Sequence, residues 1–157
     1  MIILGVDPGI ATVGYGVVSY ENNKFIDSTY GAILTPAKTP LEDRLAQIYD
    51  ELTRLIKYYK VEAMAVEELF FNNNQKTAIS VAQGRGVILL AGHKAEIPIY
   101  EFTPLQVKQA VVGYGRAEKM QVMQMVKMLL NLKEIPKPDD AADGLALAIC
   151  LAHSLRF

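Results

Sequence analysis

An apolar, β-branched run at the start of the chain ends on a single acid. Residues 2–6 favour a strand buried on both faces, and Asp7 follows them directly. Pro8 and Gly9 end this strand, and alternation then resumes over residues 13–19, which predicts a hairpin. Ligand sites in open α/β sheets lie beyond the carboxyl ends of strands, so Asp7 is a candidate site residue. An acid before Pro-Gly also commonly caps a turn, and this simpler interpretation stays open.

The next segments predict a strand, a helix and a second acid-tipped strand. Residues 24–34 alternate as a strand, and residues 41–59 place apolar side chains at helical spacing. Residues 61–66 are again mostly apolar and end on Glu67. If this strand is parallel and adjacent to the first, with the helix as a right-handed crossover, Asp7 and Glu67 lie at the same sheet edge.

The rest of the chain adds a fifth strand and more helices. Its periodicity predicts a helix over 76–94, a strand over 97–102, a helix from Thr103, a helix over 117–132 and a last helix that opens at residue 139. We therefore expect one α/β domain over residues 1–157, with a five-stranded mixed sheet flanked by helices on both faces. Gly84 and Gly86 each cost about 1 kcal/mol of helix propensity, which close approach of another helix, as in a dimer, would offset.

The last helix carries two acids at its start. Asp140 and Asp143 are three residues apart and therefore share a helix face. Acids in a first turn are also favoured by the helix dipole, so capping alone explains one or both. This helix is apolar on nearly every side, however, which predicts burial against the sheet. Two unpaired carboxylates there are costly unless a cation joins them.

Composition narrows the class of protein. Hydrophobic residues make up 51% and charged residues 21% of the 157 residues, which is typical of a globular domain. No apolar run reaches the roughly 18 residues of a membrane span, and the start lacks the basic region of a signal peptide, so we expect a cytoplasmic protein without membrane contact. Cys150, within an apolar run, is expected to be a buried thiol.

Charge is unevenly distributed despite a net charge of −1. Residues 1–71 contain 6 Lys and Arg against 10 Asp and Glu, whereas residues 72–138 contain 9 against 4. A basic middle beside acidic segments suits a metal-dependent enzyme that acts on nucleic acid, with acids for the metal and cations for phosphates. Solvated helix faces would produce the same distribution.

The acids together indicate a metal site. The candidate cluster consists of Asp7, Glu67, Asp140 and Asp143. Oxygen-only ligands favour Mg²⁺ or Mn²⁺ over zinc, and four carboxylates suit two ions. Two such ions, about 3.5 to 4 Å apart, support hydrolysis of a phosphodiester by in-line displacement. Lys108 and Lys119 lie in the basic middle and are candidates to neutralise phosphate or transition-state charge.

Five ordered motifs resemble one family. They are Ile-Leu-Gly-Val-Asp-Pro-Gly with Gly-Tyr-Gly-Val, Ala-Val-Glu-Glu-Leu-Phe, Ala-Gln-Gly-Arg-Gly-Val, Gln-Val-Lys-Gln-Ala-Val-Val-Gly and Asp-Ala-Ala-Asp. In this order they resemble the bacterial RuvC-type Holliday-junction resolvases of the ribonuclease H-like superfamily. The resemblance implies a ribonuclease H-like fold and a homodimer, built partly on the helix with Gly84 and Gly86. It also implies paired nicking of four-way DNA junctions, with a branch-migration helicase complex as partner.

The resemblance also implies residue roles. It implies metal binding by Asp7, Glu67, Asp140 and Asp143. Of the acid pair at 67–68, the first acid, Glu67, is the implied ligand. Active-site and DNA-contacting roles are carried onto Lys108 and Lys119. Phe70 is implied as a DNA-contacting aromatic, Phe71 is a second candidate, and we expect Arg85, which lies in one of the motifs, to contact DNA as well.

The sequence alone leaves other functions open. An actin-like ATPase or sugar kinase also has a first strand that ends in Asp and a Gly turn, but such folds need two domains, and this reading requires ATP hydrolysis. A non-catalytic dimeric junction-binding module would keep the basic middle, yet convergent acids would repel phosphate. Mg²⁺-dependent nicking separates that module from an enzyme. A related nuclease that acts on RNA or on other branched DNA is a further alternative.

Overall fold

A β-hairpin with a third strand leads the chain, and helices and two further strands follow. The structure, a computed structural model, describes residues 1–68 and 75–155. The elements are β1 (Ile2–Asp7), β2 (Thr12–Glu21), β3 (Lys24–Leu34), α1 (Leu41–Tyr59), β4 (Ala63–Glu67), α2 (Gln75–Lys94), β5 (Ile99–Phe102), α3 (Pro104–Val111), α4 (Lys119–Leu129) and α5 (Asp139–Ser154).

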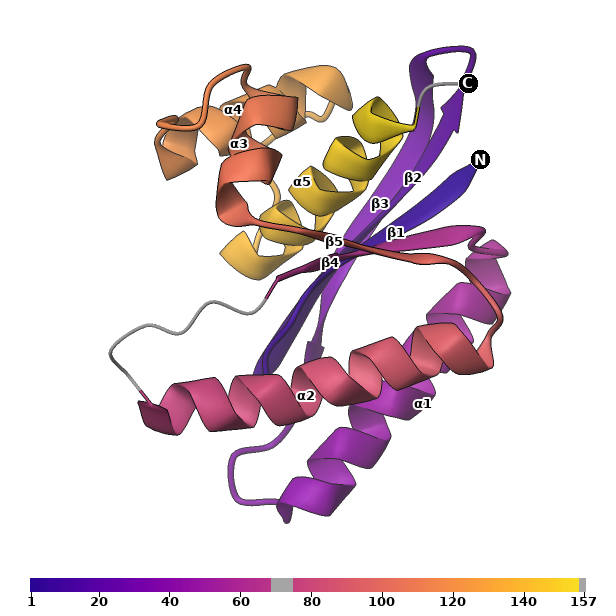
Figure 1. The fold of residues 1–157 in the computed structure, drawn as a ribbon, viewed down its shortest axis with the longest axis vertical. Helices are drawn as coiled ribbons and strands as arrows, with labels where there is room; N and C mark the ends of the chain where they lie inside the picture. Colours follow the sequence, from indigo (N-terminus) through magenta and orange to yellow (C-terminus); the bar gives the residue numbers. More distant parts are fainter. Residues whose placement is uncertain (69–74, 156–157) are drawn as a thin grey trace.

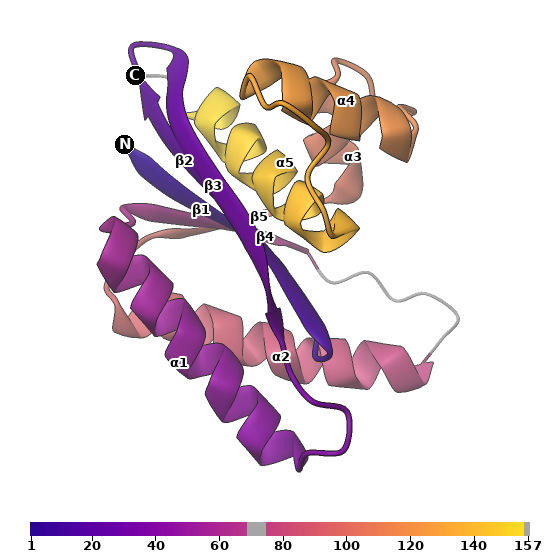
Figure 2. The ribbon, with the colours of Figure 1, turned by 180° about the vertical axis from the view of Figure 1, so that it is seen from behind.

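The strands form one mixed sheet in the order β3-β2-β1-β4-β5. β1 pairs antiparallel with β2 and parallel with β4, and β4 pairs parallel with β5. The predicted parallel pairing of the two acid-tipped strands is therefore confirmed. Helices α1 and α2 cover one face of the sheet, and α3, α4 and α5 lie on the other (Figures 1 and 2).

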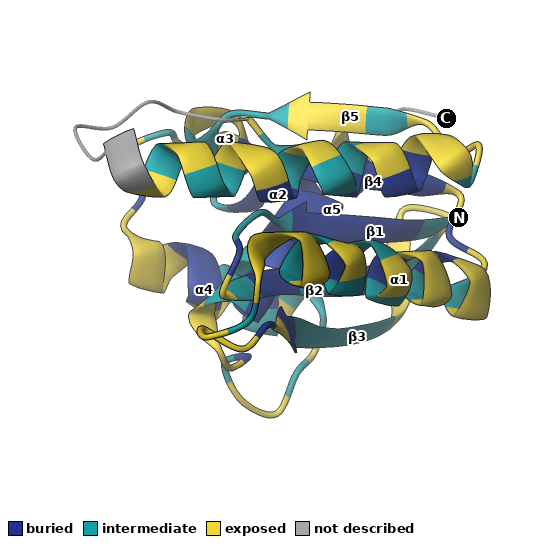
Figure 3. Ribbon diagram, turned by 90° about the horizontal axis from the view of Figure 1, so that it is seen from below, coloured by how far each residue is buried: buried dark blue, intermediate teal, exposed yellow. Residues whose placement is uncertain are grey.

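Alternate strand residues point to opposite faces of the sheet and belong to two separate hydrophobic cores. Ile3 of β1 belongs to the core under α5, whereas Leu4 belongs to the core under α1 and α2. Helix α5 is buried along most of its length, as the apolar pattern predicts (Figure 3). Among the residues that the structure describes, no helix is both long enough and apolar enough to cross a bilayer.

β4, β5 and α4 each begin two residues later than the sequence pattern predicts. β4 starts at Ala63 rather than at residue 61, because Lys60 adopts a left-handed conformation with φ 55° and Val61 still donates its N–H to Ile56 O of α1. α4 starts at Lys119 because Glu118 caps it, with reciprocal hydrogen bonds to Gln121.

The expected role of the paired glycines in α2 is wrong for one of them. A Cβ at Gly84 would collide with the backbone carbonyl of Gly9, so this glycine admits the turn after β1 of its own chain and not another helix. Gly86 differs, because a Cβ there would meet no atom of the described chain within 4 Å.

Candidate metal centre

The site lies where β1 and β4 end. Val6 pairs with Val66 in the parallel register, so Asp7 and Glu67 are the next residues along neighbouring strands. The turn after Asp7 is held by Thr35, whose hydroxyl donates to Ile10 O and accepts from the Nε of Arg44 at 2.8 Å. These two hydrogen bonds connect the turn after β1 to α1.

Helix α5 reaches this edge because the sheet has glycines, Gly5 and Gly14, where the helix backbone lies against it. A Cβ at Gly14 would overlap the backbone of Asp140, and a Cβ at Gly5 would overlap the carbonyl of Gly144. The helix therefore packs directly on the backbone of β1 and β2. This close contact carries the first turns of α5, with Asp140 and Asp143, to the end of β1.

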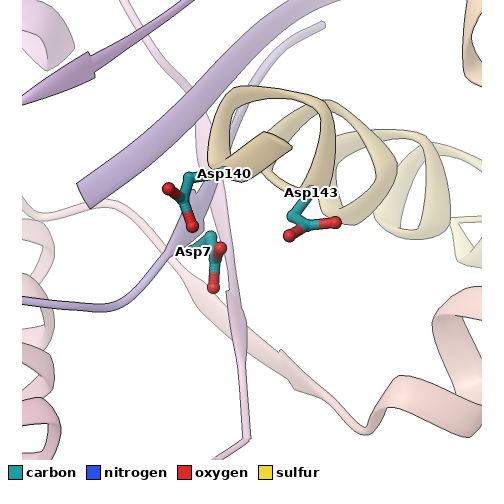
Figure 4. A group of neighbouring side chains, drawn as sticks. All are labelled: Asp7, Asp140 and Asp143. Carbon is teal, nitrogen blue, oxygen red and sulfur yellow. The ribbon is translucent and has the colours of Figure 1, made fainter. Parts of the chain in front are cut away.

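Three of the four predicted acids come together. Carboxylate oxygens of Asp7, Asp140 and Asp143 lie within 4.8 Å of one another, and the three side chains are partly buried (Figure 4). Glu67 is not in this set, but it ends the strand next to that of Asp7 and lines the same cavity as Asp143. The acids come from β1, β4 and α5, three segments far apart along the chain.

Burial and mutual repulsion oppose ionisation of the cluster. The pKa of Asp7 is raised to about 9, first by burial and then by the neighbouring charges of Asp143, Glu67 and Asp140. Burial is also the main cause that raises the pKa of Glu67 and the pKa of Asp143. Without a cation Asp7 therefore retains its proton at neutral pH, whereas full ionisation of the cluster requires compensating positive charge.

Lys119 supplies one such charge. Its Nζ lies 3.6 Å from Asp143 Oδ2 and 3.6 Å from Asp139 Oδ2. Burial opposes protonation of this lysine, but Asp143 and Asp139 outweigh burial and raise its pKa. The capping box of α4 places Lys119 in the first turn of that helix, directed at the start of α5.

Lys108 lines a cavity beside the acids. The cavity, about 220 Å³ in volume, is walled by apolar residues of α3, α4 and α5 and has a polar lining of Glu67, Lys108, Lys119 and Asp143. Thr103 caps α3 right after β5, in a capping box with Gln106, and so sets the direction in which the helix carries Lys108. Both predicted lysines thus line the cavity that adjoins the acid cluster.

Arg85 of α2 makes contacts within the chain. Its guanidinium lies 2.8 Å from Glu101 Oε1, its Nε donates to Glu67 O at 3.2 Å, and only 14% of its side chain is exposed. Phe70 and Phe71, the expected aromatic DNA contacts, lie outside the described residues.

The sequence pattern did not indicate three of these contacts. Asp139 pairs with Lys119, Thr35 holds the turn after β1, and Glu101 pairs with Arg85. Each partner is distant along the chain, and no local spacing marks it. The prediction for Cys150 is confirmed, because the thiol is buried and unbridged, with its pKa raised to about 11 by burial.

Sequence comparisons match nearly the whole chain to one family. The family model described as crossover junction endodeoxyribonuclease RuvC matches residues 3–151. The chain is 60% identical to the protein of that name from Caldanaerobacter subterraneus subsp. tengcongensis, over 98% of this chain and 93% of the relative. It is also 60% identical to the one from Alkaliphilus metalliredigens, over 100% of this chain and 96% of the relative.

Solved structures show the same fold. The Thermus thermophilus RuvC structure in complex with Holliday junction substrate superposes with a TM-score of 0.92 at 36% identity, covering 98% of this chain and 94% of that chain. The yeast mitochondrial Holliday junction resolvase Ydc2, at 15% identity and a TM-score of 0.65, shares the fold, over 96% of this chain and 78% of that chain. The predicted ribonuclease H-like architecture is therefore confirmed, and the chain belongs to the crossover junction endodeoxyribonuclease RuvC family.

Proposed function

We propose that this chain is a Mg²⁺-dependent endonuclease that resolves four-way DNA junctions by paired, symmetric nicks. The observation that carries the proposal is the convergence of Asp7, Asp140 and Asp143 within 4.8 Å at a partly buried sheet edge. Membership of the family supports the choice of reaction, as does the likeness to a relative bound to a Holliday junction. A pure binding module leaves such mutually repelling acids without a role.

The residues fit divalent cations. Asp7, Asp140 and Asp143, with Glu67 beside them, offer only carboxylate oxygens, which suit Mg²⁺ with Mn²⁺ as a substitute. Burial and the neighbouring acids raise the pKa of Asp7, and the charge of a bound cation would favour its ionised form. Four carboxylates suit two ions, which would supply an activated water and stabilise both oxygens of an in-line displacement.

The side chains around the acids have distinct tasks in this proposal. The four carboxylates hold the cations, and the packing of α5 on the sheet keeps them in place. Lys108 and Lys119, at the wall of the adjoining cavity, bind phosphate oxygens of the cut strand. A cation at the site would neutralise Asp143 in place of Lys119, whose Nζ lies 3.6 Å from Asp143 Oδ2.

We propose further that the active form is a homodimer joined through α2. Ile79 and Leu90 are 64% and 48% exposed, and Gly86, which lies on the same helix face, has open space above it. The outward side of α2 is exposed in Figure 3. An apolar strip of this kind is typical of an association surface, and a two-fold pair of sites suits two opposed cuts.

Two finer expectations belong to the same proposal. Phe70 is proposed to stack on a base at the crossover, with Phe71 as the alternative, and stacking is worth roughly 1 to 3 kcal/mol per base. The resolvase is proposed to work with a branch-migration helicase complex, on the support of family membership alone.

A cleavage assay tests the proposal. Purified protein is incubated with a synthetic four-way junction and with linear duplex of the same sequence, with Mg²⁺ or with EDTA. We expect paired nicks in the junction only when Mg²⁺ is present. Equal cutting of duplex and junction would contradict junction selectivity, and junction binding without any metal-dependent nick would favour the binding module. A single-stranded RNA and a replication fork, included as substrates, test the alternative nucleases.

A further inference from the structure

Arg85 meets the acid cluster from the opposite face of the sheet. Strand residues alternate, so the side chains of Val66 and its β5 partner Glu101 point toward α2, whereas Glu67 points toward α5. Arg85 lies on the α2 side and touches Glu67 only through its main-chain carbonyl. It therefore contacts the backbone behind a proposed ligand and leaves the carboxylate free.

The carbonyl of Glu67 needs such a donor because of Pro8. Glu68 donates its N–H to Phe102 O of β5. Successive residues of a strand face opposite neighbours, so the N–H and the C=O of Glu67 point toward β1. Continuing the register of Val6 with Val66, the N–H that would reach Glu67 O belongs to residue 8. Proline has no N–H, so the ladder ends there, and the Nε of Arg85 donates in its place.

Glu101 keeps the guanidinium in position. Its Oε1 lies 2.8 Å from an Nη of Arg85, and the side chain of Glu101 is 45% exposed at the sheet edge. One planar guanidinium thus joins α2, the end of β4 and the end of β5. The residue before it, Gly84, packs against the carbonyl of Gly9, so consecutive residues of α2 support the ends of both acid-tipped strands.

We propose that Arg85 is a positioning residue for the metal site, held by Glu101, and that it does not contact DNA. It fixes the peptide of Glu67 and thereby the direction in which the Glu67 carboxylate meets the cations. This inference rests on the proposed function for its catalytic consequence, but its effect on metal binding is measurable without DNA. Mutation of a residue that orients a metal ligand typically lowers metal affinity or activity by about 10- to 100-fold.

The test compares Arg85→Gln, Arg85→Lys and Glu101→Gln in the full chain, with Arg54→Gln, an exposed arginine of α1, as the matched control. Mn²⁺ binding is measured by calorimetry in the absence of DNA. Junction affinity is measured in EDTA at several salt concentrations, and cleavage is measured against Mn²⁺ concentration.

We expect Arg85→Gln to weaken Mn²⁺ binding and to raise the half-saturating Mn²⁺ concentration for cleavage, each by about 10- to 100-fold. Glu101→Gln should shift both in the same direction by less, because the bond to Glu67 O remains. Arg85→Lys should restore only part of the affinity, since one ammonium cannot reproduce the guanidinium fork. Junction affinity in EDTA should be unchanged in all three variants, as in Arg54→Gln.

The opposite pattern overturns the inference. Unchanged Mn²⁺ binding in folded variants rules out positioning, even if cleavage falls. Weaker junction binding in EDTA, with a salt slope smaller by about one, would identify Arg85 as a phosphate contact. If Arg85→Gln does not fold, Glu101→Gln decides, because its carboxamide keeps the shape of the exposed side chain. A wild-type protein that binds Mn²⁺ but cuts no junction contradicts the proposed function and leaves the positioning test valid.

Discussion

At the scale of single residues, Asp7 is the acid of the cluster whose pKa is raised to about 9. It ends the central strand, and burial together with the charges of three other acids causes this shift of its pKa. A carboxyl group that holds its proton at neutral pH is a poor cation ligand until it ionises, so cation binding must release that proton. Asp7 therefore connects metal affinity, protein stability and pH.

The pH dependence of stability without metal follows from this shift. Between its ordinary value near 3.8 and the raised value of about 9, Asp7 is protonated in the folded chain and ionised in the unfolded chain. The folded state then binds more protons, so stability falls as pH rises through this window. We expect the Tm in EDTA to fall from pH 5 to pH 9, and Asp7→Asn to flatten the slope and to raise the Tm at pH 8.

Thermal scans in EDTA at a series of pH values check this expectation. Asp50→Asn, which changes an exposed acid of α1, is the matched control and should keep the wild-type slope. Saturating Mg²⁺ should raise the Tm more at pH 8 than at pH 6, because bound cations favour the ionised ligands. A Tm in EDTA that increases steadily with pH up to 8 would contradict the raised pKa of Asp7.

Neutral replacements of the acids test their proposed roles one by one. Asp7→Asn, Glu67→Gln, Asp140→Asn and Asp143→Asn should each abolish Mg²⁺-dependent junction cleavage, because each removes a charged oxygen ligand while it keeps side-chain shape. Junction binding in EDTA should persist, and Asp7→Asn should tighten it by removing a charge that repels phosphate. A variant that still cuts at the wild-type rate excludes that acid from the metal site.

At the scale of elements, α5 and α2 build the site from opposite faces of the sheet. α5 brings two acids by packing on Gly5 and Gly14, and α2 supports the strand ends through Gly84 and Arg85. Gly84 and Gly86 of α2 look equivalent in the sequence but differ in surroundings. Gly84 is enclosed by the turn after Asp7, and Gly86 is open.

This difference gives a matched pair of variants on one helix. Gly84→Ala should destabilise the fold by about 1 to 3 kcal/mol, because its Cβ meets the backbone of Gly9, and it should also weaken Mn²⁺ binding by displacing the turn beside Asp7. Gly86→Ala should be neutral or stabilise the helix by up to about 1 kcal/mol. Chemical denaturation and Mn²⁺ calorimetry check both. Equal effects of the two substitutions would show that helix propensity, and not the Gly9 contact, is responsible.

At the scale of the whole molecule, the exposed strip on α2 bears on assembly. Ile79 and Leu90 are solvent-exposed in the single chain, on the opposite side of α2 from its contacts with the sheet. Paired cutting of a junction requires two active sites in a fixed relation. A dimer joined through this strip supplies that relation and covers the apolar side chains.

Charged substitutions on the strip test the dimer. Ile79→Glu combined with Leu90→Glu should convert a dimer into monomers in sedimentation velocity at micromolar concentration, because two buried charges would face their counterparts in the partner. Paired nicking should then give way to slow single nicks, with the Tm of the monomer unchanged. Tyr58→Glu, at an exposed position of α1, is the control and should leave the dimer intact. A wild-type protein that is monomeric at this concentration contradicts the interface.

Much of the architecture could be predicted before any tertiary structure was known. Strand and helix side chains repeat every two or 3.6 residues, so local spacing predicts these elements. Such spacing predicted the strand that ends on Asp7, the strand that ends on Glu67 and the helix over 41–59. The right-handed crossover rule then placed two acids at one sheet edge, as the β1 and β4 pairing confirms. The apolar character of α5 likewise predicted its burial.

Other features were decided only by packing between distant segments. Nothing near Gly84 in the sequence points to Gly9, and nothing near Arg85 points to the carbonyl of Glu67, which lacks a donor because residue 8 is proline. A local period reports which face of an element is apolar, but not which backbone atom of another element will lie against it. The amino-acid sequence by itself thus determined the strands, the helices and the acids at their ends. The tertiary structure decided how closely those acids meet and which residues hold them, because such contacts arise only when separate elements pack together.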